Sequence, residues 1–459
     1  MIANYQNIYL IGIGGIGMSA LARWFKSQGF MVGGYDLTSS SLTTQLESEG
    51  ILIHYEDLGE NIPEAFKKPE TLVIYTPAVP PSHGELAYFR AGGYDVRKRS
   101  EVLGMLTRSF YTIAIAGTHG KTTTSSMVAH ILKESGKNVF AFIGGIARNY
   151  DSNLLLGDPA AGDAIMVVEA DEYDRSFLQL YPHTAIITSM DADHLDIYGD
   201  DRQVVDSFNE FADQVVSGGL IICRSGLPLL GGREGRRRMI FGQKDSELKI
   251  GDIRIRNGAF EFDIEGVESV ENVVIGLPGR HNVYNAAAAF AAAREAGVSA
   301  EDIKSALRSF KGVKRRFETI YADGHLVYID DYAHHPAEIE ATLTAARELY
   351  PDRKVTVVFQ PHLFSRTRDF MDDFAQSLSI ADEVILLPIY PAREVPIEGI
   401  TSEALLGRLT LSDKSVVEKE ALMEKIKILD TNVLITMGAG DIDRFVEPIR
   451  SIVSHEKMD

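Results

Sequence analysis

Short apolar runs that end in polar or glycine-rich loops recur along the whole chain. Ile8–Ile11 and Tyr111–Ala116 each precede a glycine-rich loop, and after each loop apolar residues return at helical spacing. The stretch from residue 325 to 350 has the same order of apolar run, polar loop and helix, and the order is repeated from residue 354 and from residue 433. This alternation of strands and helices predicts an α/β protein with largely parallel sheets.

One segment departs from this pattern. Residues 250–266 alternate apolar and polar positions on both sides of Asn257-Gly258, which predicts a hairpin with a two-residue turn. The length of 459 residues favours about three domains. We expect an N-terminal Rossmann-like domain, a central P-loop ATPase-type α/β domain with the hairpin as an antiparallel excursion, and a C-terminal Rossmann-like domain, over residues 1–108, 109–312 and 313–459.

Composition narrows the classes of protein. A net charge of -19 argues against nonspecific binding of nucleic acid. The single cysteine, Cys223, excludes a disulfide framework within the chain and fits a reducing compartment. The first residues lack the features of a signal peptide, and no run of about 18 apolar residues is present. We therefore expect a cytoplasmic protein without nucleic-acid or membrane partners, either a monomer or a homodimer.

The stretch AGTHGKTTT most restricts the chemistry. Gly117 and Gly120 allow a tight loop whose N–H groups converge on an anion at the start of a helix. Lys121 adds a positive charge for the outer phosphates, and Thr122 offers a hydroxyl to Mg²⁺. The first glycine of the general P-loop would fall at Ile115, so this is a compact variant. We expect the loop, residues 117–123, to bind ATP or GTP through Gly117, Thr118, His119, Gly120, Lys121, Thr122 and Thr123.

A second glycine loop, GIGGIG, follows the first predicted strand. Gly12, Gly14 and Gly17 occupy the three glycine positions of a dinucleotide fingerprint, and Asp36 ends the next strand. The loop could bind NAD. It could equally bind the diphosphate of a nucleotide-sugar substrate, because the glycines recognise a diphosphate and not a nicotinamide. Asp36 could contact a ribose or cap a turn.

Two further strands of the central domain end in acidic clusters, AIMVVEADEYDRSF and HTAIITSMDADHLD. Ligands of open parallel sheets lie beyond the carboxyl ends of strands, so we expect Glu169 and His194 to hold Mg²⁺, directly or through water. Glu169 could instead be a surface carboxylate, and His194 could bond a loop carbonyl. Weaker candidates are Asp171, Asp191 and Asp193.

A later helix begins within LPGRHNVYNA and carries His281, Asn282 and Asn285 near its first turn. An amide side chain can both donate to and accept from an adenine edge, but these residues could also be caps. In the C-terminal third, three strand ends present polar residues on one predicted edge, and arginines there could bind a carboxylate or phosphate. The histidines could be metal ligands, but we favour substrate contact over zinc. These residues are Asp331, His334, His335, His362, Arg366, Arg368 and the turn Gly438–Gly440.

Taken together and in order, the motifs resemble the Mur ligases of peptidoglycan synthesis along nearly the whole chain. The runs that carry the resemblance are GIGGIGMSALA, AGTHGKTTT, EADEYDRSFL, DADHLD, LPGRHNVYNA, VKRRFE, DDYAHHP and FQPHLFSRTRDF. Several sister ligases place a carbamoylated lysine after the motif that corresponds to DADHLD. SFNEFADQVVSGG has no lysine, which is similar to the alanine-adding branch of the family.

The resemblance implies roles for particular residues. Lys121 would contact the ATP phosphates, Thr122 the first Mg²⁺, and Glu169 with His194 the second. The remaining assignments that it implies are Asn282 and Asn285 near adenine, Arg316 and Asp331 closing on the nucleotide, His335, His362 and Arg366 at the amino acid, and Gly12, Gly14, Gly15 and Gly17 at the UDP diphosphate.

The resemblance also implies the reaction. ATP would phosphorylate the lactyl carboxylate of UDP-N-acetylmuramate, and L-alanine would then attack the acyl phosphate with its amine, in a step of cell-wall synthesis that serves cell shape and division. The alternative within the family is the ligase that recycles murein tripeptide. Outside the family, a nicotinamide oxidoreductase and a P-loop switch that binds nucleotide without ligation are the competing classes.

Overall fold

The computed structural model describes residues 4–191, 201–232, 234–392 and 394–455. The chain forms two compact units, which are considered one at a time. The first unit consists of Met1–Gly251, Asp263–Glu271 and Asn285–Phe310. The second unit consists of Asp252–Phe262, Asn272–Tyr284 and Lys311–Asp459.

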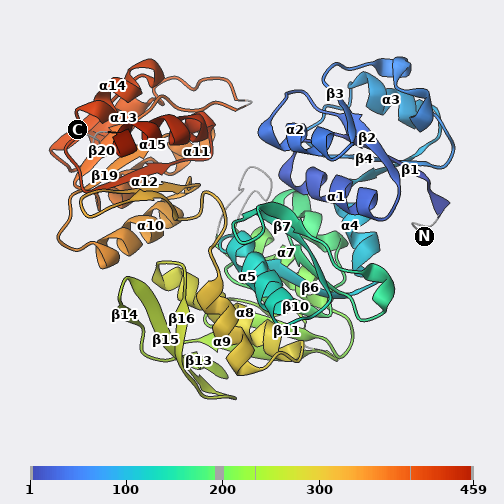
Figure 1. Ribbon diagram of the computed structural model, residues 1–459, viewed down its shortest axis with the longest axis horizontal. Helices are drawn as coiled ribbons and strands as arrows, with labels where there is room; N and C mark the ends of the chain where they lie inside the picture. Colours follow the sequence, from blue (N-terminus) through green and yellow to red (C-terminus); the bar gives the residue numbers. More distant parts are fainter. Residues whose placement is uncertain (1–3, 192–200, 233, 393, 456–459) are drawn as a thin grey trace. The chain divides into compact units, whose positions relative to one another are not determined.

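The first unit begins with a parallel sheet in the order β3-β2-β1-β4-β5 (Figure 1). Its strands are β1 (Asn7–Ile11), β2 (Met31–Tyr35), β3 (Leu52–His54), β4 (Thr71–Tyr75) and β5 (Asp95–Lys98). The helices that connect them are α1 (Ile16–Ser27), α2 (Ser41–Ser48), α3 (Gly84–Ala91) and α4 (Arg99–Thr107). The strand order reverses direction between β1 and β4. A crevice at such a switch point, beyond the carboxyl ends of the strands, is where ligands of these folds bind.

Most of the larger sheet of the first unit is parallel, in the order β13-β12-β11-β10-β6-β9-β7, with β8 antiparallel at the edge. The strands are β6 (Tyr111–Ala116), β7 (Val139–Ala147), β8 (Ser152–Leu155), β9 (Ile165–Glu169), β10 (Thr184–Ile187), β11 (Leu220–Arg224), β12 (Arg237–Gly242) and β13 (Leu248–Ile250). The central strand β6 is flanked by β10 and β9, and its residues 112–116 are buried. The helices with them are α5 (Lys121–Glu134), α7 (Asp201–Asp213), α8 (Arg280–Glu295) and α9 (Ala300–Ser309), together with the 3-10 segment η5 (Tyr173–Gln179).

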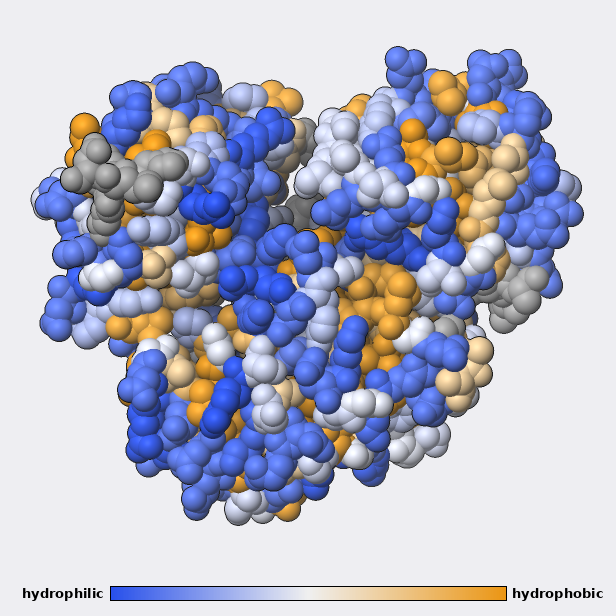
Figure 2. Space-filling model, in the orientation of Figure 1, coloured by the Kyte–Doolittle hydropathy of each residue, from blue (hydrophilic) through white to orange (hydrophobic). Residues whose placement is uncertain are grey.

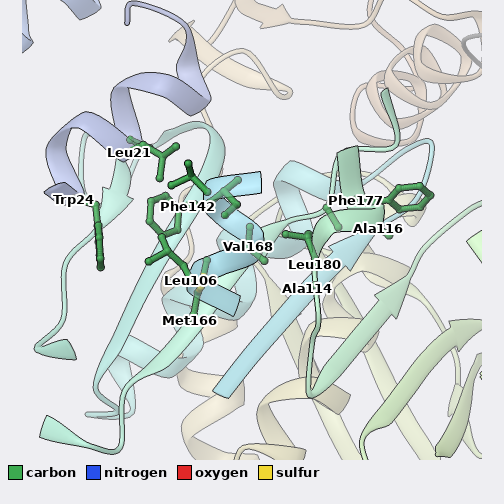
Figure 3. Packing of buried hydrophobic residues seen from close by; sticks show 14 of the residues in the cluster. Leu21, Trp24, Leu106, Ala114, Ala116, Phe142, Met166, Val168, Phe177 and Leu180 are labelled. Atoms are coloured by element: carbon green, nitrogen blue, oxygen red, sulfur yellow. The ribbon is translucent and has the colours of Figure 1, made fainter. Parts of the chain in front are cut away.

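A hydrophobic core joins the two sheets of the first unit. Helix α1 packs on β7 and β8. The centres of the Trp24 and Phe142 rings are 6.5 Å apart, and Figure 3 shows both side chains in this core. Leu21, Leu106 and Met166 belong to the same buried cluster, as Figure 3 shows. Both glycine loops are therefore carried by one continuously packed unit.

The predicted hairpin is present. Strand β14 (Arg254–Arg256) pairs antiparallel with β15 (Ala259–Gly266), and Asn257 and Gly258 both have positive φ, 52° and 74°. These values suit a two-residue turn whose twist matches the flanking strands. The pair is followed by β16 (Val270–Ile275), which also pairs with β15.

The second unit contains a sheet in the order β17-β18-β22-β19-β20-β21. Figure 1 labels β19 and β20 of this sheet. All its pairs are parallel except β17 with β18. The strands are β17 (Glu318–Ala322), β18 (Val327–Asp331), β19 (Val355–Phe359), β20 (Glu383–Leu386), β21 (Asp413–Val416) and β22 (Val433–Met437), with helices α10 (Pro336–Leu349), α11 (Phe364–Asp369), α12 (Met371–Leu378), α13 (Ser402–Arg408), α14 (Leu422–Lys427) and α15 (Val446–His455). Separate buried clusters cover the two faces of this sheet.

The three sheets confirm the predicted α/β class with Rossmann-like first and last parts. Figure 2 shows hydrophilic residues over most of one face, with hydrophobic residues scattered among them. Among the described residues, no helix has the length and apolar character that a membrane crossing requires.

Candidate active site

The phosphate-binding loop lies between the carboxyl end of β6 and the start of α5. Gly117 and Gly120 have φ of 141° and 82°, values that side chains disfavour. A Cβ on Gly117 would lie 2.0 Å from Thr188 Oγ1, and one on Gly120 would lie 2.6 Å from Asn285 Oδ1. Both glycines are therefore required by conformation and by contact.

Hydroxyl side chains that follow β10 hold this loop in place. Ser189 Oγ accepts a hydrogen bond from the backbone N–H of His119 at 2.8 Å, and it lies 2.9 Å from Thr118 Oγ1. Thr188 Oγ1 donates to the carbonyl of His119 at 2.5 Å. Asp191, a weaker magnesium candidate, donates its N–H to Thr118 Oγ1 at 3.1 Å. Sequence reasoning missed Thr188 and Ser189, although hydroxyl residues at the carboxyl end of a neighbouring strand were a usable signal.

Lys121 is the first residue of α5 and is held by a buried ion pair. Its Nζ lies 2.9 Å from Glu172 Oε1 and donates to the carbonyl of Gly117 at 2.7 Å. Burial alone would lower the pKa of Lys121, but the carboxylates of Glu172, Asp171 and Glu169 outweigh burial and raise it. Burial also raises the pKa of Glu172, and the ion pair opposes that shift. Sequence reasoning placed Glu169 near the phosphates and missed Glu172, three residues further along.

Glu169 ends β9, directly beside β6, and its Oε2 accepts a hydrogen bond from the N–H of Gly144 at 3.0 Å. Asp171 lies 3.5 Å from a guanidinium nitrogen of Arg99, at the start of α4. The carboxylates of Glu169, Asp171 and Glu172 all act electrostatically on Lys121. His194, the other predicted magnesium ligand, lies outside the described residues, as does the weaker candidate Asp193.

The residues present suit a hard cation held beside a triphosphate. Mg²⁺ is bound through one or two carboxylates together with phosphate oxygens and water. Thr122, in the first turn of α5, and Glu169 offer oxygen ligands of this kind on neighbouring elements. Among the described residues, no three His, Cys, Asp or Glu side chains form a cluster able to hold a metal ion by themselves.

The first glycine loop lines a cavity of about 760 Å³. The residues that line it include Tyr35, Asp36 and His83, the four glycines Gly12, Gly14, Gly15 and Gly17, and Gly144, Glu169 and Asp171. Within this lining Asp36 lies against Gly14, whereas Gly17 lies against Arg99, the side chain that is 3.5 Å from Asp171. Asp36 Oδ2 accepts from the N–H of Gly14 at 2.7 Å, and Oδ1 accepts from the N–H of Thr38 at 3.2 Å. The Asp36 carboxylate therefore stabilises the conformation of the glycine loop, whether or not it also contacts a ribose.

The two asparagines predicted near adenine lie in different surroundings. Asn285, on α8, is buried against Gly120 of the phosphate loop. Asn282 is also buried, and its amide donates to the carbonyl of Pro278 at 2.6 Å. Contact of either residue with adenine stays a prediction.

In the second unit, Asp331 is the last residue of β18, and its carboxylate binds two backbone N–H groups. It accepts hydrogen bonds from the N–H groups of Phe317 at 2.7 Å and Ala333 at 2.8 Å. Burial raises the pKa of Asp331 to about 6. Arg316 lies 3.5 Å from Glu338. The neighbouring Arg315, which sequence reasoning did not single out, pairs with buried Asp330 at 2.9 Å and supports the strand ends.

The residues predicted to bind the amino acid also lie at this edge of the sheet in the second unit. The parallel strands β18, β22 and β19 end together, in register at Asp331, Met437 and Phe359. The centres of the His334 and His362 rings are 6.1 Å apart. Burial lowers the pKa of His334. The other predicted residues of this edge are the helix cap His335, Arg366 and Arg368 in α11, and the turn Gly438–Gly440 after β22.

The first unit thus carries two glycine loops, one of them followed by Lys121, and both lie at carboxyl ends of parallel strands. These are features of α/β proteins that bind phosphorylated ligands. The match to known proteins is more specific. The chain belongs to the Mur ligase family: the models described as Mur ligase family, catalytic domain; Mur ligase middle domain; and Mur ligase, glutamate ligase domain match residues 7–111, 115–293 and 315–440.

Individual relatives resemble the chain over nearly its whole length. It is 54% identical to a UDP-N-acetylmuramate-L-alanine ligase of Cytophaga hutchinsonii, over 98% of this chain and 97% of the relative. A crystal structure of UDP-N-acetylmuramate-alanine ligase from Thermotoga maritima superimposes with a TM-score of 0.82 at 30% identity, covering 98% of this chain and 100% of the other. A murein peptide ligase from Psychrobacter arcticus gives a TM-score of 0.73 at 25% identity, covering 98% and 99%.

Proposed function

We infer that the chain is an ATP-dependent ligase that joins L-alanine to the lactyl carboxylate of UDP-N-acetylmuramate in peptidoglycan precursor synthesis. The relatives with 54% identity over nearly the full length carry the name of this activity. Family membership supports the use of ATP. We place the reaction in the cytoplasm, where ATP and nucleotide sugars are available.

One structural observation carries this assignment. The cavity beside the first glycine loop extends to Glu169 and Asp171, which are among the carboxylates around the phosphate-loop lysine. A sugar nucleotide whose diphosphate lies on Gly12–Gly17 can therefore direct its far end toward the γ-phosphate of an ATP held by residues 117–123. An NAD-dependent enzyme would need a hydride-transfer site at this end of the cavity instead.

The chemistry follows from the charges. A carboxylate oxygen is a poor leaving group, so the γ-phosphoryl group of ATP is transferred to the lactyl carboxylate, which gives an acyl phosphate and ADP. Lys121 stabilises the negative charge that spreads over the transferred group. The L-alanine amine, with a pKa of about 8, loses a proton and attacks the acyl carbon. The amide bond forms as the acyl C–O bond breaks, and phosphate leaves with the bonding electrons.

We propose that Thr122 and Glu169 hold Mg²⁺, with His194 as a further ligand. When bound, the cation neutralises charge on the phosphates during transfer. Lys121 is paired with Glu172. Nucleotide binding would require the lysine to exchange this carboxylate, at least in part, for phosphate oxygens.

The remaining assignments are also proposals. Asn282 and Asn285 would contact adenine, and Arg316 and Asp331 would close on the bound nucleotide. His335, His362 and Arg366 would bind the amino acid. His335 is our candidate for the group that accepts the proton from the amine.

The test is the substrate dependence of ADP formation by the full-length protein. At fixed ATP and UDP-N-acetylmuramate, ADP should form only when L-alanine is added, and mass spectrometry should show the UDP-N-acetylmuramoyl-alanine product. Faster turnover with the murein tripeptide L-alanyl-γ-D-glutamyl-diaminopimelate would favour the recycling ligase. ADP formation that is indifferent to both acceptor and amine would contradict ligase activity.

A further inference from the structure

A histidine that sequence analysis did not identify lines the same cavity. His83 precedes the first residue of α3, in the loop that follows β4, so it lies opposite the glycine loop at the switch point between β1 and β4. It lines the cavity together with Tyr35 and Asp36. Loops at such a switch point form the two walls of a nucleotide crevice.

The ring of His83 is almost completely buried. Only 7% of the residue is exposed, and neither Nδ1 nor Nε2 has a hydrogen-bond partner among the residues that the structure describes. Its nearest charged neighbour is Asp57, whose Oδ2 lies 3.8 Å from Nδ1. A buried imidazole without partners costs free energy, which suggests that a ligand completes its hydrogen bonding.

The surroundings hold this ring firmly in place. Asp57 accepts hydrogen bonds from the N–H groups of Gly84, Gly59 and Glu85, at 2.6, 3.1 and 3.1 Å. The His83 ring packs on that of Tyr35, with 4.5 Å between ring centres. A rigid loop of this kind fixes the position of a recognising group before the ligand arrives.

The direction of the substrate determines which of its parts reaches His83. In a UDP-sugar the diphosphate separates the nucleoside from the sugar, and the diphosphate belongs on Gly12–Gly17. The reacting carboxylate must lie toward Glu169 and Asp171, on the side of Gly17 and Arg99. The nucleoside then lies on the side of Gly14, where Asp36 follows Tyr35 and the Tyr35 ring packs on His83. The Asp36 carboxylate accepts a hydrogen bond from the N–H of Gly14, so it would lie beside the diphosphate. In a UDP-sugar the ribose is attached to the diphosphate on the nucleoside side. The base lies beyond the ribose.

The neighbouring charge favours one tautomer of the ring. A neutral imidazole carries one donor and one acceptor nitrogen. Because the Asp57 carboxylate faces Nδ1, the proton is favoured on Nδ1 and Nε2 remains an acceptor. Uracil offers a donor at N3–H, whereas cytosine has an acceptor at N3.

We propose that His83 is a specificity-determining residue of the sugar-nucleotide pocket, whose ring accepts a hydrogen bond from N3–H of the substrate's uracil. This inference rests on the proposed function, because it takes the substrate to be a UDP-sugar. It adds a role for the loop after β4, to which the sequence motifs assign none.

The test compares binding of UDP and CDP by calorimetry to wild type, His83→Phe and His83→Gln. Phe keeps a ring and removes both nitrogens, while the Gln amide keeps an acceptor at similar reach. Wild type should bind UDP about tenfold more tightly than CDP, the value of one hydrogen bond. His83→Phe should lose about tenfold in UDP affinity and little in CDP affinity, and His83→Gln should recover part of the loss. His325→Gln, at an exposed position in the second unit, is the matched control.

Kinetics supply a second readout. The Phe variant should raise KM for UDP-N-acetylmuramate while its KM for ATP stays at the wild-type value. Equal losses of UDP and CDP affinity, or no loss of either, would overturn the uracil contact. If wild type binds neither UDP nor UDP-N-acetylmuramate, the proposed function itself fails. The two failures are therefore distinguishable.

Discussion

Replacing Lys121 by Met tests the ion pair and the phosphate loop together. The variant removes the ammonium that lies 2.9 Å from Glu172 Oε1 and leaves that carboxylate, only 2% exposed, without its cation. Met retains most of the length of the lysine stem, so the packing of α5 changes little. A second variant, Lys121→Met with Glu172→Gln, removes both charges.

The substitution should lower both the stability of the fold and the rate of ligation. Breaking one side of a buried ion pair costs about 3 kcal/mol of stability, whereas replacing both partners by neutral groups costs far less. Loss of the cation at the transferred phosphoryl group should lower the ligation rate by about 10³-fold or more. Burial favours protonated Glu172, so the destabilisation of the single variant should be larger at pH 8 than at pH 5, where the carboxyl group can take up a proton.

Denaturant unfolding at the two pH values gives the free energies, and a coupled assay of ADP formation gives the rates. The double variant should regain about half or more of the lost stability and none of the activity. A double variant as unstable as the single one would refute the ion-pair reasoning. Near-normal turnover in either variant would refute the role of Lys121 in phosphoryl transfer.

Three other predictions concern the same sites. Gly117→Ala should abolish ATP binding, measured by calorimetry, because its Cβ would lie 2.0 Å from Thr188 Oγ1; wild-type affinity would contradict the loop geometry. Since the pKa of Asp331 is raised to about 6, its carboxylate should become protonated as pH falls through that value, and carbon-13 NMR of labelled Asp should show the step, which Asp331→Asn removes. If the charged form is required, kcat should fall over the same range. Arg99→Met should raise KM for UDP-N-acetylmuramate about tenfold, because it removes a cation that lines the cavity; an unchanged KM would exclude that contact.

The elements of the site could be predicted because local pattern determines them. Apolar runs gave the strand Tyr111–Ala116 to the residue, and Asn257-Gly258 predicted the hairpin turn, whose two positive φ angles the structure contains. The gathering of Glu169 and the phosphate loop at one edge followed from the general rule for parallel sheets.

The contacts between distant segments could not be predicted in this way. Glu172 forms an ion pair with Lys121, which lies 51 residues earlier in the sequence. Ser189 forms a hydrogen bond with His119, which lies 70 residues earlier. His83 is informative because its buried ring nitrogens have no hydrogen-bond partner in the described part of the chain, which is a property of packing and not of sequence spacing. Such features depend on which side chains the complete fold places around a buried group.

In the proposed reaction the carboxylate of the sugar nucleotide is phosphorylated before the amine attacks. UDP-N-acetylmuramate labelled with oxygen-18 in its lactyl carboxylate tests this directly, with mass spectrometry of the phosphate released in the presence of ATP and L-alanine. The acyl-phosphate route predicts that each released phosphate carries one oxygen from the carboxylate. Phosphate free of carboxylate oxygen would contradict it.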